Sequence, residues 1–255
     1  MITVFVCEDS IEGIFTGVYE AWASKLGHAN VELGIESADN LELFKEYVSV
    51  RTEIEKAQKV TRTICNRMGM EVYEWICQAL LSNGQEKANA VYHTIVAGLQ
   101  LREGSRVMDY LTCPNVCKVF EYARGTGREA HHYTGFVRFS ETFNGVLFSK
   151  INPKNNVLTI LASYFADRLP LENWIIYDEK RGIFAVHESK KQWAIIFGEH
   201  INKEMINNFS ESEKEFQKLW KGFRESISIR ERENYQLQRQ NLPLRFRSNM
   251  IEFAE

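Results

Sequence analysis

One stretch decides the fold, Arg128-Glu129-Ala130-His131-His132-Tyr133-Thr134-Gly135-Phe136-Val137-Arg138-Phe139. Up to about Gly135, small and apolar residues recur at helical spacing, whereas the residues from Phe136 to Phe139 favour a strand. The stretch also contains two arginines, a carboxylate and two adjacent histidines, side chains that can hold phosphate, move a proton or bind a metal ion. The stretch does not match any established catalytic motif. The stretch therefore predicts a functional site without naming a reaction.

The chain before this stretch is expected to form a β-α-β start followed by helices. Residues 2–7 and 31–35 are short runs rich in apolar residues, typical of strands. Asp9 and Glu12 have the spacing of a capping box, which predicts the start of a helix between the two runs. Beyond residue 53, apolar residues recur three and four positions apart in successive stripes. We therefore expect a β-α-β start over 1–52 and a helical bundle over 53–134.

The chain after this stretch is expected to form an antiparallel sheet with one helix packed across it. Asn144-Gly145 is a strong hairpin signal. The expected elements of this ββαββ-like segment, which covers 135–200, are strands at 136–139, 146–151, 174–177, 183–187 and 193–197 and a helix that ends near 168. Runs of helices and runs of strands that do not alternate regularly define the fold class as α+β.

The last segment, 201–255, is expected to form a C-terminal helix and a basic tail. Apolar side chains recur at helical spacing between residues 210 and 230 and predict a buried stripe made of Phe216, Trp220, Phe223 and Ile227. Glutamines and a proline interrupt the pattern beyond the helix, so the tail is expected to be extended over the surface. The four segments are expected to pack as one compact unit.

The composition is typical of a globular protein. In the absence of a recognisable signal or membrane segment, we expect the protein to be cytoplasmic. Of the 255 residues, 44% are hydrophobic and 25% are charged, and the formal net charge is −3, so no global basic field points to nucleic acid. The N-terminal residues lack the basic and apolar regions of a signal peptide. No segment approaches the roughly 20 apolar residues of a membrane span, so we expect no membrane association.

The five cysteines favour reduced thiols. Cys113 and Cys117 form a C-x3-C pair, but Phe120 stands where a radical-SAM iron–sulfur motif needs its third cysteine. A zinc site would need about two more nearby ligands. The sequence therefore predicts neither a metal ion nor a cofactor in this chain.

Arginines in and after the last predicted helix of the bundle are candidates for phosphate binding. Arg124, Arg128 and His131 are spaced four and three residues apart, so they share one stripe of a helix. Arg138 on the following predicted strand would extend this set, because guanidinium groups bind phosphate through paired hydrogen bonds. The alternative is a solvated face on which the arginines pair with local carboxylates, namely Glu121 and Glu129.

Three titratable residues are candidates for catalysis. His131 would serve as a general acid or base, because an imidazole can take up and release a proton near neutral pH. Asp167, next to Arg168, is expected near the end of a helix, and Asp178 and Arg181 flank a turn. The alternative is that these carboxylate–arginine pairs only close loops. The sequence contains no G-x-S-x-G, Walker A or G-x-G-x-x-G motif, so whether the chain is an enzyme stays open.

Several segments together resemble a bacterial family linked to DNA metabolism and DNA repair whose core domain has no established function. The segments that carry the resemblance are Arg128–His131, Gly135–Phe139, Ile151–Pro153, Asn156–Leu158, Phe165–Arg168, Trp174–Asp178 with Arg181, Glu12-Gly13, and Leu219–Lys221 with Arg230–Arg232. The resemblance implies a domain that also occurs fused to uracil-DNA glycosylase-like proteins. It further implies a stand-alone form encoded beside a radical-SAM DNA repair protein.

The leading hypothesis is a cytoplasmic DNA repair or DNA-processing factor that binds DNA and acts with a radical-SAM partner protein. Since this chain lacks cluster-binding cysteines, any radical chemistry would belong to the partner. The residues expected to contact DNA are Arg124, Arg128, Arg138, Arg168 and Arg181. The alternatives are a glycosylase-like or hydrolytic enzyme acting on a modified base and a non-catalytic protein adaptor. The enzyme hypothesis requires His131, Asp167 and Asp178 to converge in one pocket.

Overall fold

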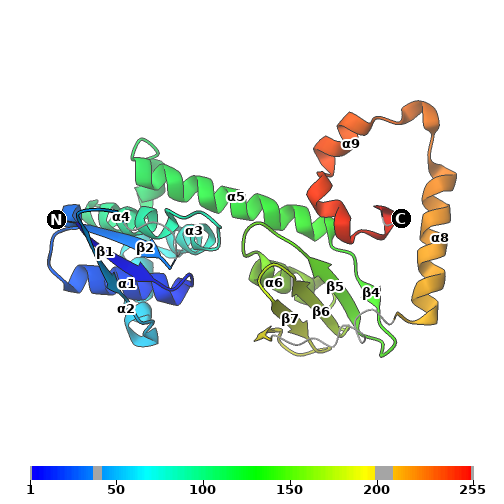
Figure 1. Ribbon diagram of the computed structural model, residues 1–255, viewed down its shortest axis with the longest axis horizontal. Helices are drawn as coiled ribbons and strands as arrows, with labels where there is room; N and C mark the ends of the chain where they lie inside the picture. Colours follow the sequence, from blue (N-terminus) through cyan, green and yellow to red (C-terminus); the bar gives the residue numbers. More distant parts are fainter. Residues whose placement is uncertain (1, 37–41, 199–208, 254–255) are drawn as a thin grey trace. The chain divides into compact units, whose positions relative to one another are not determined.

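The computed structural model describes residues 2–36, 42–198 and 209–253 (Figure 1). Contacts divide the chain into two compact units, of which the first comprises Met1–Arg128 with Lys154–Asn156 and the second Glu129–Pro153 with Val157–Glu255. Each unit holds its own sheet together with helices, so the α+β class is confirmed. The boundary between the units falls inside helix α5 (Pro114–Phe136), near the expected end of the helical bundle.

The first unit begins with the expected β-α-β arrangement. Strand β1 (Ile2–Cys7) pairs in parallel with β2 (Val31–Ile35), and α1 (Ile11–Ala23) connects them. A short 3₁₀ turn, η1 (His28–Asn30), precedes β2. A third parallel strand, β3 (Lys45–Ser49), lies on the other side of β1. The sequence does not predict β3, because most of its side chains are exposed and polar, without the apolar pattern of a buried strand.

Helix α1 begins one residue later than the capping-box pattern suggests. The side chain of Ser10, and not that of Asp9, accepts a hydrogen bond from the backbone N–H of Gly13, at 3.0 Å. A serine at this position satisfies one of the backbone donors that the first turn of a helix leaves without a partner.

Helices form the rest of the first unit, as expected from the apolar stripes. They are α2 (Ile54–Met68), α3 (Met70–Leu80), α4 (Lys87–Gln100), the 3₁₀ turn η2 (Gly104–Asp109) and the first part of α5. One apolar core joins these helices to α1, β1 and β2, and it includes the fully buried side chains of Ile14, Ile64 and Ile76.

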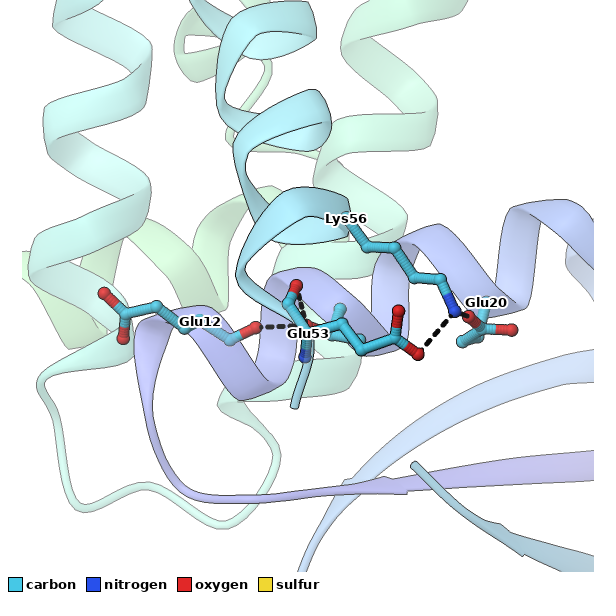
Figure 2. A network of polar contacts seen from close by, with 5 residues as sticks. Glu12, Glu20, Glu53 and Lys56 are labelled. Atoms are coloured by element: carbon cyan, nitrogen blue, oxygen red, sulfur yellow. Dashed lines mark hydrogen bonds and ion pairs between the residues drawn. The ribbon is translucent and has the colours of Figure 1, made fainter. Parts of the chain in front are cut away.

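A polar network fastens the start of α2 to α1 (Figure 2). The hydroxyl of Thr16 lies 2.7 Å from the Glu12 carbonyl oxygen and accepts a hydrogen bond from the Glu53 N–H at 3.1 Å. The ammonium group of Lys56 lies 2.6 Å from a Glu20 carboxylate oxygen and 2.7 Å from one of Glu53. These carboxylates, Glu20 above all, raise the pKa of Lys56. The network fixes the point at which α2 begins.

Close packing of α1 against β1 gives a first testable prediction. A Cβ atom at Gly17 would overlap the Sγ of Cys7, a fully buried thiol, whereas a Cβ at Gly125 in α5 would meet nothing within 4 Å. We expect Gly17→Ala to lower the free energy of unfolding by about 1–3 kcal/mol. Gly125→Ala is expected to raise it by about 0.5–1 kcal/mol, because alanine loses less backbone entropy in a helix. Chemical denaturation followed by circular dichroism checks both, and equal effects of the two substitutions would contradict the packing described.

The second unit contains a five-stranded sheet in the order β4-β5-β6-β7-β8. The strands are β4 (Ser140–Glu141), β5 (Leu147–Ile151), β6 (Trp174–Asp178), β7 (Ile183–His187) and β8 (Ala194–Phe197). Three of the four strand pairs are antiparallel, as expected, but β5 and β6 are parallel. Parallel pairing follows from α6 (Leu158–Arg168), which packs on β6 and β7 and connects β5 to β6 as a crossover.

The strand expected at 136–139 does not form. Helix α5 continues through Phe136, and the Val137 N–H still donates to the Tyr133 carbonyl at 3.0 Å. The Arg138 guanidinium donates to the Gly135 carbonyl at 2.9 Å, and a basic side chain in this position satisfies a carbonyl that the helix end leaves without a partner. Strand pairing begins only at Ser140.

The C-terminal part departs most from expectation. Helix α8 (Glu211–Ile227) is where a helix was predicted, but its apolar stripe is not buried, since exposed fractions range from 45% for Trp220 to 69% for Phe216. The tail is not extended either. It forms α9 (Tyr235–Asn241) and the 3₁₀ turns η3 (Arg230–Arg232), η4 (Leu244–Asn249) and η5 (Ile251–Phe253). The tail folds back because Phe246 is buried in the core of the second unit.

Candidate functional site

Arg124 and Arg128 lie on the exposed side of α5, within the first unit. Their neighbours Ala123 and Thr126 are fully buried, so the opposite side of the helix faces the core. Neither arginine forms an ion pair with any residue that the structure describes. Both guanidinium groups are therefore available to an anion from outside.

Within the described residues, neither of the two carboxylates expected as local salt partners, Glu121 and Glu129, forms an ion pair with Arg124 or Arg128. Glu129 is buried and lies 3.3 Å from the guanidinium of Arg245, which the η4 turn supplies. Glu121 is exposed, and its carboxylate lies 4.0 Å from the Sγ of Cys117. Glu129 thus forms an ion pair within the second unit, with Arg245. Glu121 remains a negative charge near Arg124 and Arg128 on α5.

The two histidines of the opening stretch have different environments within the second unit. His131 is exposed, and its carbonyl accepts a hydrogen bond from the Thr134 hydroxyl at 2.7 Å. His132 is half-buried and stacks on Phe246, with ring centroids 5.6 Å apart and ring planes at 26°. His132 therefore contributes to the packing of the C-terminal tail, and His131 is the more exposed of the two histidines.

Arg138 has a structural role. Its Nε donates to the Glu252 carboxylate at 2.9 Å, and its Nη1 donates to the carbonyls of Gly135 and Val137. These contacts join the end of α5 to the C-terminal tail. They leave Arg138 poorly placed for the phosphate contact expected from the sequence.

Asp178 and Arg181 close the turn between β6 and β7. The Asp178 side chain is fully buried, its Oδ2 lies 2.8 Å from Nη1 of Arg181, and its Oδ1 accepts from the backbone N–H groups of Lys180 and Arg181. Burial raises the pKa of Asp178, and Arg181 partly offsets this rise. Arg181 also donates to the Pro153 carbonyl at 3.3 Å. The pair matches the local structural alternative left open by the sequence.

Asp167 and Arg168 are exposed at the end of α6. Asp167 lines a cavity of about 640 Å³ together with the buried His187, whereas neither His131 nor Asp178 lines it. The three candidate catalytic residues therefore occupy an exposed helical face, a cavity and a buried turn. His187 was not among the residues predicted for the site, although a histidine at an inward-facing position of a predicted strand is a signal in the sequence.

The described residues contain no group of three or more histidine, cysteine, aspartate or glutamate side chains placed to hold a metal ion. Within the same residues, no helix has both the length and the apolar character needed to cross a membrane. The cysteines are free thiols, and burial raises the pKa of the Cys7 thiol to about 12.

Together, these features define an α+β protein with an exposed arginine pair on one helix and a polar cavity beside one sheet. The chain belongs to the DUF4130 family, described as a domain of unknown function, whose model matches residues 85–252. The match begins just before α4 and includes α5, the second sheet and α8. No curated protein matches the chain.

Proposed function

We propose that this chain is a cytoplasmic DNA repair or DNA-processing factor that binds DNA through the exposed face of α5 and acts with a radical-SAM partner protein. The observation that carries the DNA-binding part is the pair of exposed arginines without ion-pair partners among the described residues. Arginine is suited to phosphate because its planar donors match two phosphate oxygens at once. The resemblance to a DNA repair family supports the same function.

The spacing of the two arginines suits a nucleic-acid backbone. Four residues of helix advance about 6 Å along its axis, and phosphates repeat about every 3.4 Å per strand along a DNA duplex. Because the net charge of the chain is −3, attraction to DNA must come from a local group of cations such as this pair and not from the protein as a whole. Binding is therefore expected to be weak and strongly dependent on salt.

The test is a titration of labelled duplex and single-stranded DNA at several salt concentrations, with wild-type protein and the Arg128→Ala variant. The variant is expected to bind more weakly, with a shallower salt dependence. Equal binding by the two proteins, or no binding even at low salt, would contradict the proposed DNA contact.

The exposed apolar face of α8 is the proposed docking surface for the protein partner. It consists of Phe216, Leu219, Trp220, Phe223 and Ile227, and each of these side chains is at least 45% exposed. Contiguous exposed apolar surface of this kind marks protein interaction sites, and an amphipathic helix typically binds in an apolar groove. Because the chain has no complete radical-SAM cysteine motif, the partner would supply the iron–sulfur cluster.

Substitutions on this face test the docking surface. The double substitution Trp220→Ser and Phe223→Ser is expected to weaken partner binding at least 100-fold, since buried aromatic anchors dominate binding energy at interfaces. The matched control is Lys218→Ala, on the polar side of the same helix, which is expected to change affinity less than threefold. Pull-down and calorimetry with the co-expressed radical-SAM protein measure both. Unchanged binding by the double variant would rule out this face.

A non-catalytic adaptor is the second candidate function, and the same face of α8 favours it. An adaptor would retain the partner through α8 without contacting DNA. Co-purification of the partner by wild-type protein, combined with no DNA binding at low salt, would establish the adaptor in place of the DNA-binding factor.

A further inference from the structure

The cavity that Asp167 lines belongs wholly to the second unit, and the DNA-binding proposal does not use it. It lies where the end of α6 meets the end of β7 and the loop between β7 and β8, and its volume is about 640 Å³. Volumes of this size accommodate small organic ligands. The side chains that matter for its chemistry are Asp167, His187, Lys190, Lys191 and Trp193.

His187 is held in one orientation at the wall of the cavity. Its Nδ1 lies 2.8 Å from the Glu172 carbonyl oxygen, and its ring stacks on Trp174 with centroids 5.0 Å apart and planes at 10°. A carbonyl oxygen can only accept, so Nδ1 carries a proton, and Nε2 is a hydrogen-bond acceptor whenever the ring carries no second proton. No described residue bonds Nε2. The histidine thus offers one oriented acceptor to a ligand.

Lys190 supplies a positive charge on a fixed loop. Its backbone N–H donates to the Pro170 carbonyl at 2.9 Å, which fastens the loop to the chain after α6. Its φ of 63° lies in the left-handed region, a conformation that is uncommon for a lysine. Lys191 is paired with Glu188 at 2.7 Å, whereas Lys190 has no ion pair with a described residue. Lys190 is therefore the cation of the cavity that is available to an anionic ligand.

Trp193 adds a flat apolar wall. Its side chain is half-buried and packs against the apolar core of the second unit, so the indole is held in place. Aromatic side chains beside a cation are the common means of holding a nucleobase and its phosphate. Asp167, at the end of α6, provides a second acceptor for the N–H groups of a base.

We infer that this cavity binds a mononucleotide unit. The base stacks on Trp193, its N–H groups donate to His187 Nε2 and Asp167, and its phosphate lies against Lys190. Two other ligand classes fit less well. A metal ion would have only one carboxylate and one imidazole beside two lysines, and an inorganic anion would leave the indole and the imidazole acceptor unused. The ligand is either a free mononucleotide or an unpaired nucleotide of a DNA strand. The second of these two sources rests on the proposed function.

Calorimetry with three probes tests the ligand class. Deoxyguanosine monophosphate, whose base is rich in N–H donors, is expected to bind saturably. Deoxyguanosine without phosphate and deoxyribose 5-phosphate without base are each expected to bind at least tenfold more weakly. Absence of binding by deoxyguanosine monophosphate at millimolar concentration would overturn the inference. So would equal affinity for deoxyribose 5-phosphate, because the base would then contribute nothing.

Paired variants test the residues. Lys190→Asn removes the charge but tolerates the left-handed backbone, and it is expected to weaken deoxyguanosine monophosphate binding about tenfold while leaving deoxyguanosine unaffected. His187→Asn and His187→Gln both remove the ring, but only glutamine reaches the position of Nε2. The His187→Gln variant is therefore expected to bind deoxyguanosine monophosphate more tightly than the His187→Asn variant does. Lys180→Asn, at an exposed lysine of the β6–β7 turn, is the matched control. Loss of binding in the control equal to that of Lys190→Asn would contradict the assignment.

The two sources of the nucleotide are separated by a second ligand and a second variant. If the cavity takes a nucleotide of the strand, a single-stranded oligonucleotide is expected to bind the Lys190→Asn variant more weakly than it binds wild-type protein. The Arg124→Ala/Arg128→Ala variant is expected to keep its affinity for the free mononucleotide. Mononucleotide binding that survives when all DNA binding fails would support the cavity and overturn the proposed function, so the two failures can be distinguished.

Discussion

Replacing Arg124 and Arg128 together with alanine is expected to weaken DNA binding by about 10- to 100-fold at low salt. It is also expected to lower the slope of log K against log salt by about 2, because each phosphate contact that is lost releases roughly one counterion fewer. The effect should be similar for different DNA sequences, since phosphate contacts carry no base information. Fluorescence anisotropy at four or five salt concentrations measures both quantities.

Glu121 provides a control of opposite sign on the same helix. It lies seven residues before Arg128 and three before Arg124, so it belongs to the same side of α5. Its exposed carboxylate repels phosphate, so Glu121→Gln is expected to strengthen DNA binding two- to fivefold. A double arginine variant that binds as wild type, or a glutamine variant that binds more weakly, would contradict the electrostatic account.

The second large effect is expected at the turn between β6 and β7. Arg181→Ala should lower the free energy of unfolding by about 3 kcal/mol, because it leaves the fully buried carboxylate of Asp178 without its ion-pair partner. Asp178→Asn is the control. It removes the charge but keeps an oxygen that accepts from the backbone N–H groups of Lys180 and Arg181. The asparagine variant is therefore expected to be the more stable of the two in chemical denaturation. The reverse order would contradict this account of the turn.

The pH dependence of stability follows from the same carboxyl group. Burial raises the pKa of Asp178 more than Arg181 lowers it, so the group binds its proton more tightly in the folded protein than in the unfolded chain. Its contribution to stability is then complete below the unfolded pKa of about 3.9 and is lost as the pH rises through the folded pKa. Wild-type stability relative to Asp178→Asn is expected to decrease as the pH rises above about 4 and through the raised pKa of the folded protein. A relative stability that increases over this range would contradict the sign of the shift.

Most of the elements were predictable because local patterns report them directly. The apolar stripes of α2, α3 and α4, the Asn144-Gly145 turn and the apolar runs of β5, β6 and β7 each carry their own periodicity. The direction in which neighbouring strands pair was harder to predict from the sequence. The parallel pairing of β5 with β6 depends on the crossover through α6, and this is a property of tertiary structure.

The candidate site was predictable only in part. Helical spacing placed Arg124 and Arg128 on one side of α5, but it could not show that Arg138 bonds to the C-terminal tail or that Glu129 bonds to Arg245. Both partners lie more than a hundred residues away along the chain. The apolar stripe of α8 shows the same limit, because periodicity reveals which face is apolar and not whether anything covers it. The role inferred for His187 depends on the cavity that it lines, and the sequence does not reveal this cavity.

Photocrosslinking at Gly125 tests the central claim, DNA binding through α5, most directly. A Cβ there meets no atom within 4 Å, so a benzoylphenylalanine side chain can be accommodated beside Arg124 and Arg128. The same photoreactive group in place of Phe143, an exposed aromatic residue of the β4–β5 turn, is the control. We expect DNA crosslinks from position 125 that decrease with added salt, and few from position 143. Crosslinks from position 143 that equal or exceed those from position 125 would contradict the proposed site.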